Sequence, residues 1–346
     1  MKARMDLPGN LVEASSLVWP TSLAARPGAS EDRDEPAIVT AFFDIDRGAW
    51  NQRTSEISSK YQRSVDYYFE CFRYVAAIKN QLIVFTSPEL AGRVVEMRRQ
   101  FGLADHTIVI AVDNLFGLKE LAPLRDEIAA QMTDGFRDFV WRPTAPEYNM
   151  ADYVLVNALK TSFVCTAIEM GAIAARQIAW IDFGYARSDK IVDATTPWSF
   201  DFGDKINLFS IFAMDERPVY EIVRGGEVYI QGCHIVGPAT AWPRFNGMMT
   251  DALKALIACN LIDDDQTMLL MAYRADPGFF TLRRHPIDPE LDWRFIFRRF
   301  QQGQKIPEDS ALPGVWLHPH PNWFRDLKNQ VRRRLRRTVR NIRNRG

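Results

Sequence analysis

The sequence predicts an α/β protein with a mixed, mainly parallel sheet flanked by helices, and three observations support this fold class. From residue 37 onward, short apolar runs alternate with segments of helical periodicity, which is typical of parallel strands joined by helical crossovers. A Gly-Gly pair in the second half indicates an antiparallel hairpin. With 346 residues and 47% hydrophobic composition, the chain can also bury a large core.

The first half repeats a strand–helix pattern after residues 1–36, a Pro- and Gly-containing segment that we expect to be a poorly ordered leader. Proline suits the first position of a helix, so "SPE" at 87–89 predicts a helix start. The predicted elements are strand 37–43, helix 61–79, strand 81–86, helix 87–101 and strand 107–112. Because ligands bind at the carboxyl ends of parallel strands, the loops after these strands are candidate ligand sites.

The second half begins with a helical stretch at about 147–171, followed by a buried strand at 177–182. Further strands are predicted at 206–212, 219–223 and 228–232. The "RGGE" sequence between the last two predicts a two-residue hairpin, because glycine tolerates positive φ at both turn positions. The sheet is therefore expected to be mixed, in a folded unit that spans residues 37–305.

The zero net charge of the chain conceals two regions of opposite charge. Residues 325–346 carry ten Lys or Arg and one acid, which leaves 33 basic and 42 acidic residues in positions 1–324. After a Pro- and His-containing linker at 306–322, residues 323–346 place apolar side chains at near-helical spacing among arginines. We expect a basic amphipathic helix that binds an anionic membrane surface. The alternative is nucleic-acid binding, which is disfavoured because the body of the chain contains no nucleic-acid module.

The cysteines and the apolar runs indicate the compartment. Four scattered cysteines form no CxxC pair and no zinc spacing, a pattern typical of a reduced cytoplasmic protein. No apolar run reaches the roughly 18 residues that span a bilayer, and the N-terminus lacks the apolar core of a secretory signal. The expected location is the cytoplasm, peripheral on the inner face of the cytoplasmic membrane.

An aspartate ends the buried strand at 177–182 and is followed closely by a glycine. In "IAWIDFGYARSD", Asp182 follows an apolar run, and Gly184 permits close approach of a ligand. One interpretation is that the carboxylate caps the next turn by accepting backbone N–H bonds. The other is that it holds a divalent cation, a ribose hydroxyl or a sugar hydroxyl at the ligand crevice.

Three segments carry a resemblance to a known family. "IVTAFFDIDRGAW" at 38–50, "KTSFVCTAIEMGAIAARQIAWIDFGYAR" at 160–187 and "DDDQTMLLMAY" at 263–273 resemble, in order and spacing, the HtrL/YibB (WlaTC-type) bacterial family. The resemblance covers about 37–285. It implies a GT-A-like, Rossmann-like fold and a glycosyltransferase that moves a sugar from a nucleotide-sugar donor to a surface glycan such as lipopolysaccharide, O-antigen or capsule. The acceptor would be a glycan or a lipid-linked glycan.

The same resemblance implies a set of donor contacts. GT-A enzymes place Asp-x-Asp at the end of a central strand to hold a metal on the donor diphosphate. Here the pattern is Asp182-x-Gly184, so a divalent metal (Mn²⁺ or Mg²⁺) is left open, with Asp182 and His234 as its candidate ligands. The candidate donor-binding residues are Thr40, Asp44, Arg63, Lys160, Asp182 and Gly184. Arg47 and Arg53 are further candidates for the diphosphate, although most arginines are only solvated.

The resemblance also implies an acceptor side, which rests on two later segments. Gly232 and His234 in "VYIQGCHIVG", together with Gln266, are the candidate acceptor-binding residues. Asp264 and Asp265 are the candidate catalytic base of an inverting transfer, because a base must reach the acceptor oxygen. The alternative for these acids is capping of the helix that follows them. For the whole chain, the alternative function is a non-catalytic scaffold that binds membrane or glycan.

Overall fold

The computed structural model describes part of the chain in enough detail for analysis. The described residues are 7–8, 11, 15–19 (backbone only), 35–50, 57–210, 214–284 and 298–299. The chain divides into two compact units, Met1–Ala213 with Arg217–Ala311, and Met214–Glu216 with Leu312–Gly346. Only residues 214–216 of the second unit are described. The predicted linker at 306–322 and basic helix at 323–346 lie outside the described residues.

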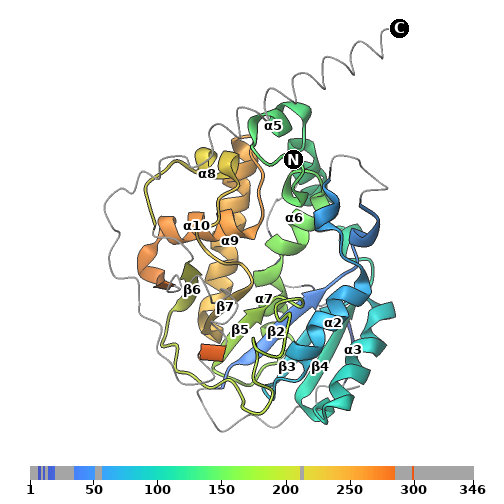
Figure 1. Cartoon of the computed structure of the whole chain (residues 1–346). Coiled ribbons are helices and arrows are strands. Elements are labelled where there is room, and N and C mark those ends of the chain that lie inside the picture. Colours follow the sequence, from blue (N-terminus) through green and yellow to red (C-terminus); the bar gives the residue numbers. More distant parts are fainter. Residues whose placement is uncertain are drawn as a thin grey trace. The chain divides into compact units, whose positions relative to one another are not determined.

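One mixed sheet forms the centre of the first unit (Figure 1), and it confirms the predicted fold class. Among the described residues its strands run in the order β1-β4-β3-β2-β5-β7-β6-β8. The strands are β1 (Ser15–Trp19), β2 (Ala37–Phe42), β3 (Leu82–Thr86), β4 (Thr107–Val112), β5 (Gln177–Ile181), β6 (Ile206–Ser210), β7 (His234–Pro238) and β8 (Phe280–Arg284). The pairs β4–β3, β3–β2, β2–β5 and β6–β8 are parallel, and the other pairs are antiparallel. Strand β1 lies within the predicted leader.

Helices cover both faces of the sheet. The α-helices are α2 (Val65–Ala76), α3 (Pro88–Gln100), α4 (Ala122–Gln131), α5 (Asp134–Phe139), α6 (Ala151–Ala158), α7 (Lys160–Glu169), α8 (Val219–Gly225), α9 (Trp242–Ala258) and α10 (Asp265–Ala275). The 3₁₀ turns are η3 (Arg47–Ala49), η4 (Ser59–Tyr61), η5 (Ala104–His106), η6 (Leu115–Gly117), η7 (Pro146–Tyr148), η8 (Ala239–Ala241) and η9 (Pro277–Phe279). Of the described helices, none has the length and apolarity that crossing a bilayer requires.

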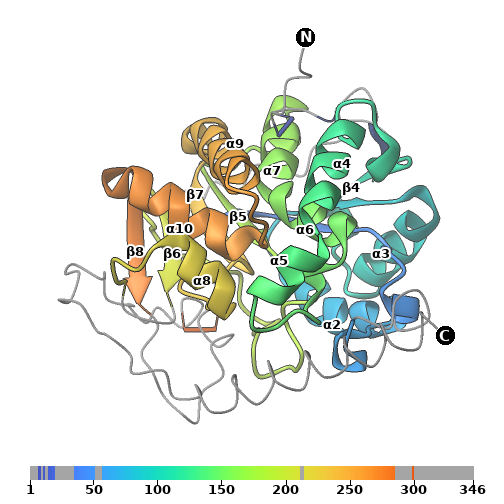
Figure 2. The ribbon, with the colours of Figure 1, turned by 90° about the horizontal axis from the view of Figure 1, so that it is seen from above.

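Alternation along the strands assigns each face its own core. Val84 joins a cluster with Phe72 of α2, whereas the next residue, Phe85, stacks near Phe163 of α7 on the opposite face. Figure 2 shows α7 and α9 on one side of the strands and α2 on the other. Trp180 of β5 belongs to the α7 face, with its ring 6.1 Å from that of Phe163. The next residue, Ile181, packs on the α2 face.

The strand order contains a topological switch beside β2. From β2 the chain continues outward to β3 and β4, and it then returns to place β5 on the other side of β2. Loops after β2 and β5 therefore diverge and leave a crevice at the carboxyl ends of these two strands. Ligands bind at such switch points in open α/β sheets.

The predicted helical stretch at about 147–171 consists of three pieces. The turn η7 precedes α6, and α6 is separated from α7 by Leu159, whose φ of −77° and ψ of 0° interrupt the helix. The break places Lys160 in the first turn of α7, where its side chain reaches the switch point between β2 and β5.

The predicted hairpin at 219–232 is wrong. Residues 219–225 form α8, which begins after Pro218 and buries Ile222 and Val223, and residues 228–232 form no strand. Gly226 has φ 59° and ψ 47°, the left-handed conformation that ends many helices. A Gly-Gly pair therefore marks a helix end here, since the same positive φ serves a hairpin turn and a helix C-terminus. The antiparallel neighbour of β5 is β7 instead.

Candidate functional site

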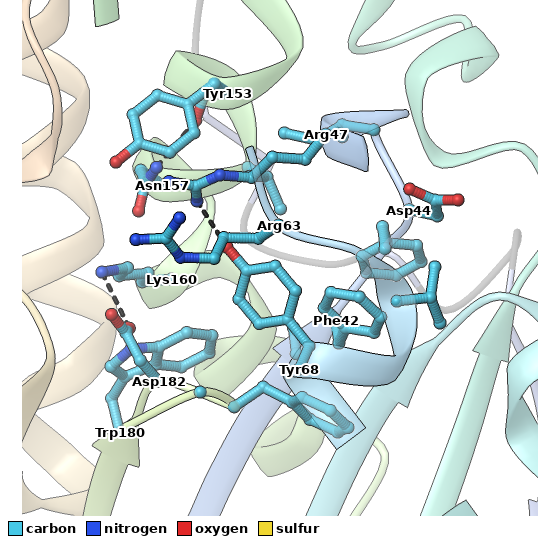
Figure 3. Close-up of a pocket in the computed structure, with 17 residues that line it drawn as sticks. Phe42, Asp44, Arg47, Arg63, Tyr68, Tyr153, Asn157, Lys160, Trp180 and Asp182 are labelled. Atoms are coloured by element: carbon cyan, nitrogen blue, oxygen red, sulfur yellow. Dashed lines mark hydrogen bonds and ion pairs between the residues drawn. The ribbon is translucent and has the colours of Figure 1, made fainter. Parts of the chain in front are cut away.

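A pocket opens at the carboxyl ends of β2 and β5, the switch point of the sheet (Figure 3). The space free of protein atoms in this pocket is about 750 Å³, which includes open solvent. Its walls come from the end of β2 and the loop after it, the start of α2, one face of α6 with the first residue of α7, and the end of β5. Its polar lining residues are Asp44, Arg47, Arg63, Tyr68, Tyr153, Asn157, Lys160, Trp180 and Asp182.

Lys160 lies at the inner end of the pocket and is held by three oxygens. Its ammonium nitrogen is 2.9 Å from Asp182 Oδ1, 2.8 Å from Asp265 Oδ2 and 2.8 Å from the backbone oxygen of Gly232. A lysine ammonium has three hydrogens to donate, so these contacts use all of them. In this structure Lys160 therefore has no N–H left to donate in the predicted contact with the sugar donor.

The carboxylate of Asp182 faces side chains and the pocket. Trp180 Nε1 donates to its Oδ1 at 2.8 Å, and Lys160 forms the ion pair, whereas the turn that follows is closed by Tyr185 N–H and the backbone oxygen of Asp182. The side chain of Asp182 remains 37% exposed. Among the described residues no backbone N–H donates to this carboxylate, so the capping interpretation is wrong. Asp182 lines the pocket instead.

Burial and charge act in opposite directions in this cluster. Burial would lower the pKa of Lys160, but Asp182 and Asp265 outweigh burial and raise the pKa above its ordinary value. Burial raises the pKa of Asp265, whereas the Lys160 ammonium lowers it and Asp182 adds to the rise. Lys160 therefore stays a cation across the physiological range.

Two arginines project into the pocket, and neither forms an ion pair with a described residue. Arg47 Nε donates to the backbone oxygen of Tyr61 at 2.8 Å, and its guanidinium contacts the Tyr68 hydroxyl. Arg63 donates to backbone oxygens in its own turn and stacks 5.1 Å from the ring of Tyr67. In the described part of the chain, no carboxylate lies within ion-pair distance of either guanidinium. Figure 3 shows both groups directed towards the end of the pocket that holds Lys160.

Aromatic rings form the walls around these charges. The Tyr68 ring lies 4.9 Å from that of Phe42, and Trp180 lies beneath the Lys160 side chain. A Cβ atom at Gly184 would lie 3.0 Å from Tyr68 Cδ1. The tyrosine ring can pack this closely because residue 184 has no side chain. Gly184 was predicted to permit the close approach of a ligand; in the structure the group that approaches it is the Tyr68 ring.

Several pocket residues were absent from the sequence prediction. Tyr153, Val156 and Asn157 of α6 line the pocket together with Lys160 of α7, which was already among the predicted donor-binding residues. Their spacing of three, four and seven residues is that of one helical face. Trp180 of β5 lies two residues before Asp182, which directly follows the strand. Side chains two residues apart in a strand point to the same face, so both line the pocket. These two periodicities are the signals that identify these residues.

The acceptor candidates lie elsewhere. His234 is fully buried and packs its ring 4.1 Å from that of Phe209. It pairs with Ile181 across β5 and β7, so it shares the α2 face with Ile181 and points away from Asp182. Gly232 contributes its backbone oxygen to Lys160, and Gln266 is in the first turn of α10. None of these three residues belongs to the described pocket lining.

The three acids at the start of α10 contact other groups of the protein. Asp264 is the N-cap, and its side chain accepts the Gln266 N–H at 3.1 Å. Asp265 is 3% exposed and holds Lys160. Asp263 accepts the Thr267 hydroxyl at 2.8 Å. Neither candidate base lines the pocket, although Asp265 is one contact away from it through Lys160.

The remaining donor candidates divide between the pocket mouth and the core. Asp44 is exposed and lines the pocket, with its Oδ1 accepting the Asp46 N–H at 2.9 Å. Thr40 is fully buried within β2 and is not part of the lining, because it lies before the carboxyl end of the strand. Arg53 lies outside the described residues.

The residues at this strand end do not fit a divalent metal. The oxygens of Asp182 and Asp265 are already bridged by an ammonium ion, and His234 points to the other face of the sheet. No group of three or more His, Cys, Asp or Glu side chains within the described ranges is arranged to hold a metal ion.

Comparison with known proteins identifies the relatives of the chain. Residues 34–302 match the family model described as "Bacterial protein of unknown function (HtrL_YibB)". The chain is 34% identical over 258 residues to Protein HtrL of Escherichia coli (strain K12), an alignment that covers 72% of this chain and 88% of that protein. The matched region contains every described residue of the pocket. These matches confirm the resemblance carried by the three sequence segments.

Proposed function

The chain belongs to the HtrL_YibB family of bacterial proteins of unknown function, and from its pocket we propose that it is a glycosyltransferase that uses a nucleotide-sugar donor. The single observation that carries the proposal is the pairing of two arginines, which have no described acidic partner, with a carboxylate at the sheet's switch point. Phosphate and sugar are two of the chemical parts of such a donor; the arginines suit the phosphate and the carboxylate suits the sugar.

The arginines supply the phosphate contacts. Guanidinium groups donate paired hydrogen bonds to phosphate oxygens, and Arg47 and Arg63 are directed to the same space in the pocket (Figure 3). Backbone oxygens and aromatic rings hold both groups in place, so little side-chain freedom is lost on binding. As the diphosphate leaves, these cations stabilise the negative charge that develops on it.

Asp182 and the aromatic walls supply the contacts to sugar and base. The carboxylate of Asp182 accepts hydrogen bonds from hydroxyl groups, and Trp180 and Tyr153 offer flat apolar surfaces beside it. In the transfer, the bond between the anomeric carbon and the diphosphate oxygen breaks, and a bond to the acceptor hydroxyl oxygen forms. The hydroxyl proton passes to a base, for which the described pocket lining offers the carboxylates of Asp44 and Asp182.

A second candidate function is nucleotide-dependent binding without transfer. It is favoured by the positions of Asp264 and Asp265, since one caps α10 and the other is buried against Lys160. Asp182 is itself engaged by Lys160. A scaffold of this kind would bind a nucleotide-sugar in the same pocket and leave it intact.

Turnover separates these functions. We would incubate the full chain with UDP-, GDP- and CMP-sugars and membrane extract as acceptor, and measure the release of nucleotide. The glycosyltransferase predicts release from one donor that falls at least about tenfold in Asp182→Asn, the equivalent of roughly 1.4 kcal/mol. The matched control is Lys205→Met, which alters an exposed lysine. Donor binding without release would establish the scaffold, and neither binding nor release would reject both.

The acceptor and the location form a separate part of the proposal. Residues 323–346 have the composition of a basic amphipathic helix, and such helices lie on anionic lipid. We propose that this segment holds a cytoplasmic enzyme at the inner membrane surface, where lipid-linked glycans are accessible.

A further inference from the structure

We infer that the ammonium group of Lys160 stands in place of a divalent cation at this strand end, so that the pocket binds a diphosphate with protein cations alone. The inference rests on the proposed function, because it concerns how the same pocket holds its donor. Three features of the described residues carry it: the oxygens around Lys160, the space at two glycines, and the two arginines of the lining.

The oxygens around Lys160 are those that a hard cation would take. Two carboxylates and one backbone carbonyl, from Asp182, Asp265 and Gly232, lie 2.8–2.9 Å from the ammonium nitrogen. Magnesium binds such oxygens at about 2.0–2.1 Å and calcium at about 2.3–2.6 Å. An ion at either distance from the same oxygens would lie against the ammonium nitrogen. The lysine and a divalent cation therefore exclude each other.

The two glycines show that this arrangement fills the available space. A Cβ atom at Gly232 would lie 1.8 Å from Asp265 Oδ2, so only glycine lets the carboxylate reach Lys160 here. At Gly184, where an Asp-x-Asp pattern has its second acid, a Cβ atom would lie 3.0 Å from the Tyr68 ring. An acidic side chain at this position would press on the pocket wall. Tyr68 therefore occupies the space of the missing acid.

Two arginines of the lining can meet a diphosphate without added metal. Lys160 is ion-paired with both Asp182 and Asp265, a group of three charges with one net negative charge, and Asp44 is a further acid of the lining. The guanidinium groups of Arg47 and Arg63 are the cations of the described lining that face the pocket with no ion-pair partner. The two phosphates of a nucleotide-sugar each carry one negative charge. Two arginines offset these charges directly, and arginine remains charged at every physiological pH.

Equilibrium binding tests the inference without any need for turnover. UDP and GDP would be titrated calorimetrically into the full chain, once with excess EDTA and once with Mn²⁺. The expected result is the same affinity within about twofold, and a loss of at least about tenfold in the Arg47→Met/Arg63→Met double variant. An affinity that rises tenfold or more with Mn²⁺ would overturn the inference and leave the proposed function intact. Failure to bind in both conditions would reject the two together.

Direct Mn²⁺ binding gives a second, independent measurement. Electron paramagnetic resonance of free Mn²⁺ should show no uptake by the wild-type chain without nucleotide, and uptake by Lys160→Met, in which the two carboxylates lose their cation. Wild-type uptake that Asp182→Asn abolishes would contradict the inference, and so would a folded Lys160→Met variant that binds no Mn²⁺. If circular dichroism shows that Lys160→Met does not fold, the wild-type titrations decide.

Discussion

Replacing Lys160 by methionine should cost stability as well as function. The substitution keeps an unbranched side chain but removes the only described cation that contacts the buried carboxylate of Asp265. It leaves the carboxylates of Asp265 and Asp182 facing each other and the carbonyl of Gly232 without its donor. Uncompensated charge in a buried position is unfavourable, because the carboxylate has lost its hydration and gained no partner.

The exposure of the two acids sets the size of the effect. The Asp265 side chain is 4% exposed, and breaking a buried ion pair by removing one partner costs about 3–5 kcal/mol. The Asp182 side chain is 37% exposed, so solvent screens its pairing and its share is about 0–1 kcal/mol. We therefore expect the free energy of unfolding to fall by about 3–5 kcal/mol, mostly because of Asp265.

Urea denaturation followed by circular dichroism would measure this loss. Lys205→Met, at an exposed position, is the matched control and should change the free energy of unfolding by less than about 0.5 kcal/mol. Adding Asp265→Leu to Lys160→Met should recover more than half of the loss, because removing both partners leaves no buried charge. A loss below about 1 kcal/mol in Lys160→Met, or a double variant less stable than the single one, would refute the reasoning.

Three further predictions test other features of the chain. Gly232→Ala should lower the free energy of unfolding by about 1–3 kcal/mol, because the new methyl group displaces the Asp265 carboxylate; an unchanged denaturation midpoint would contradict the close contact. Burial, with a contribution from Glu147, raises the pKa of Asp263 to about 8. Between pH 5 and 8 the folded chain then keeps a proton that the unfolded chain has released, so stability falls as pH rises, by up to about 1.4 kcal/mol per pH unit. Asp263→Asn should remove this slope, and parallel stability–pH curves for the two proteins would refute it. Deleting 323–346 should abolish sedimentation with phosphatidylserine vesicles and spare donor turnover in solution; retained vesicle binding would exclude the segment as the anchor.

The parallel half of the sheet could be predicted because its strands are continuous apolar runs. Strands β2, β3, β4 and β5 are buried on both faces, so nearly all residues in each run are apolar. The ends of these runs mark the strand boundaries in the sequence. The Ser-Pro start of α3 also lies where proline chemistry predicts it. The segment at 219–232 failed because a Gly-Gly pair has two structural uses, and nearby residues do not distinguish them.

The pocket could be predicted from the sequence only in part, because several of its contacts join segments that are distant in the sequence. Asp182 and Gly184 were identified from the end of a buried strand, a local pattern. By contrast, Lys160 meets Gly232 and Asp265 across separations of 72 and 105 residues, and no periodicity reports such a contact. His234 was misplaced for a related reason, since no strand was predicted at 234–238, and the register of β7 turns the side chain to the other face.

The most direct test of the central claim is to locate a bound nucleoside diphosphate by a crystal structure of the full chain grown with UDP or GDP. The account predicts electron density for both phosphates within hydrogen-bond distance of Arg47 and Arg63, with the Lys160–Asp182 contact intact and the ribose or sugar side near Asp182. Density for the nucleotide at any other surface, or phosphates bound away from both arginines, would contradict it.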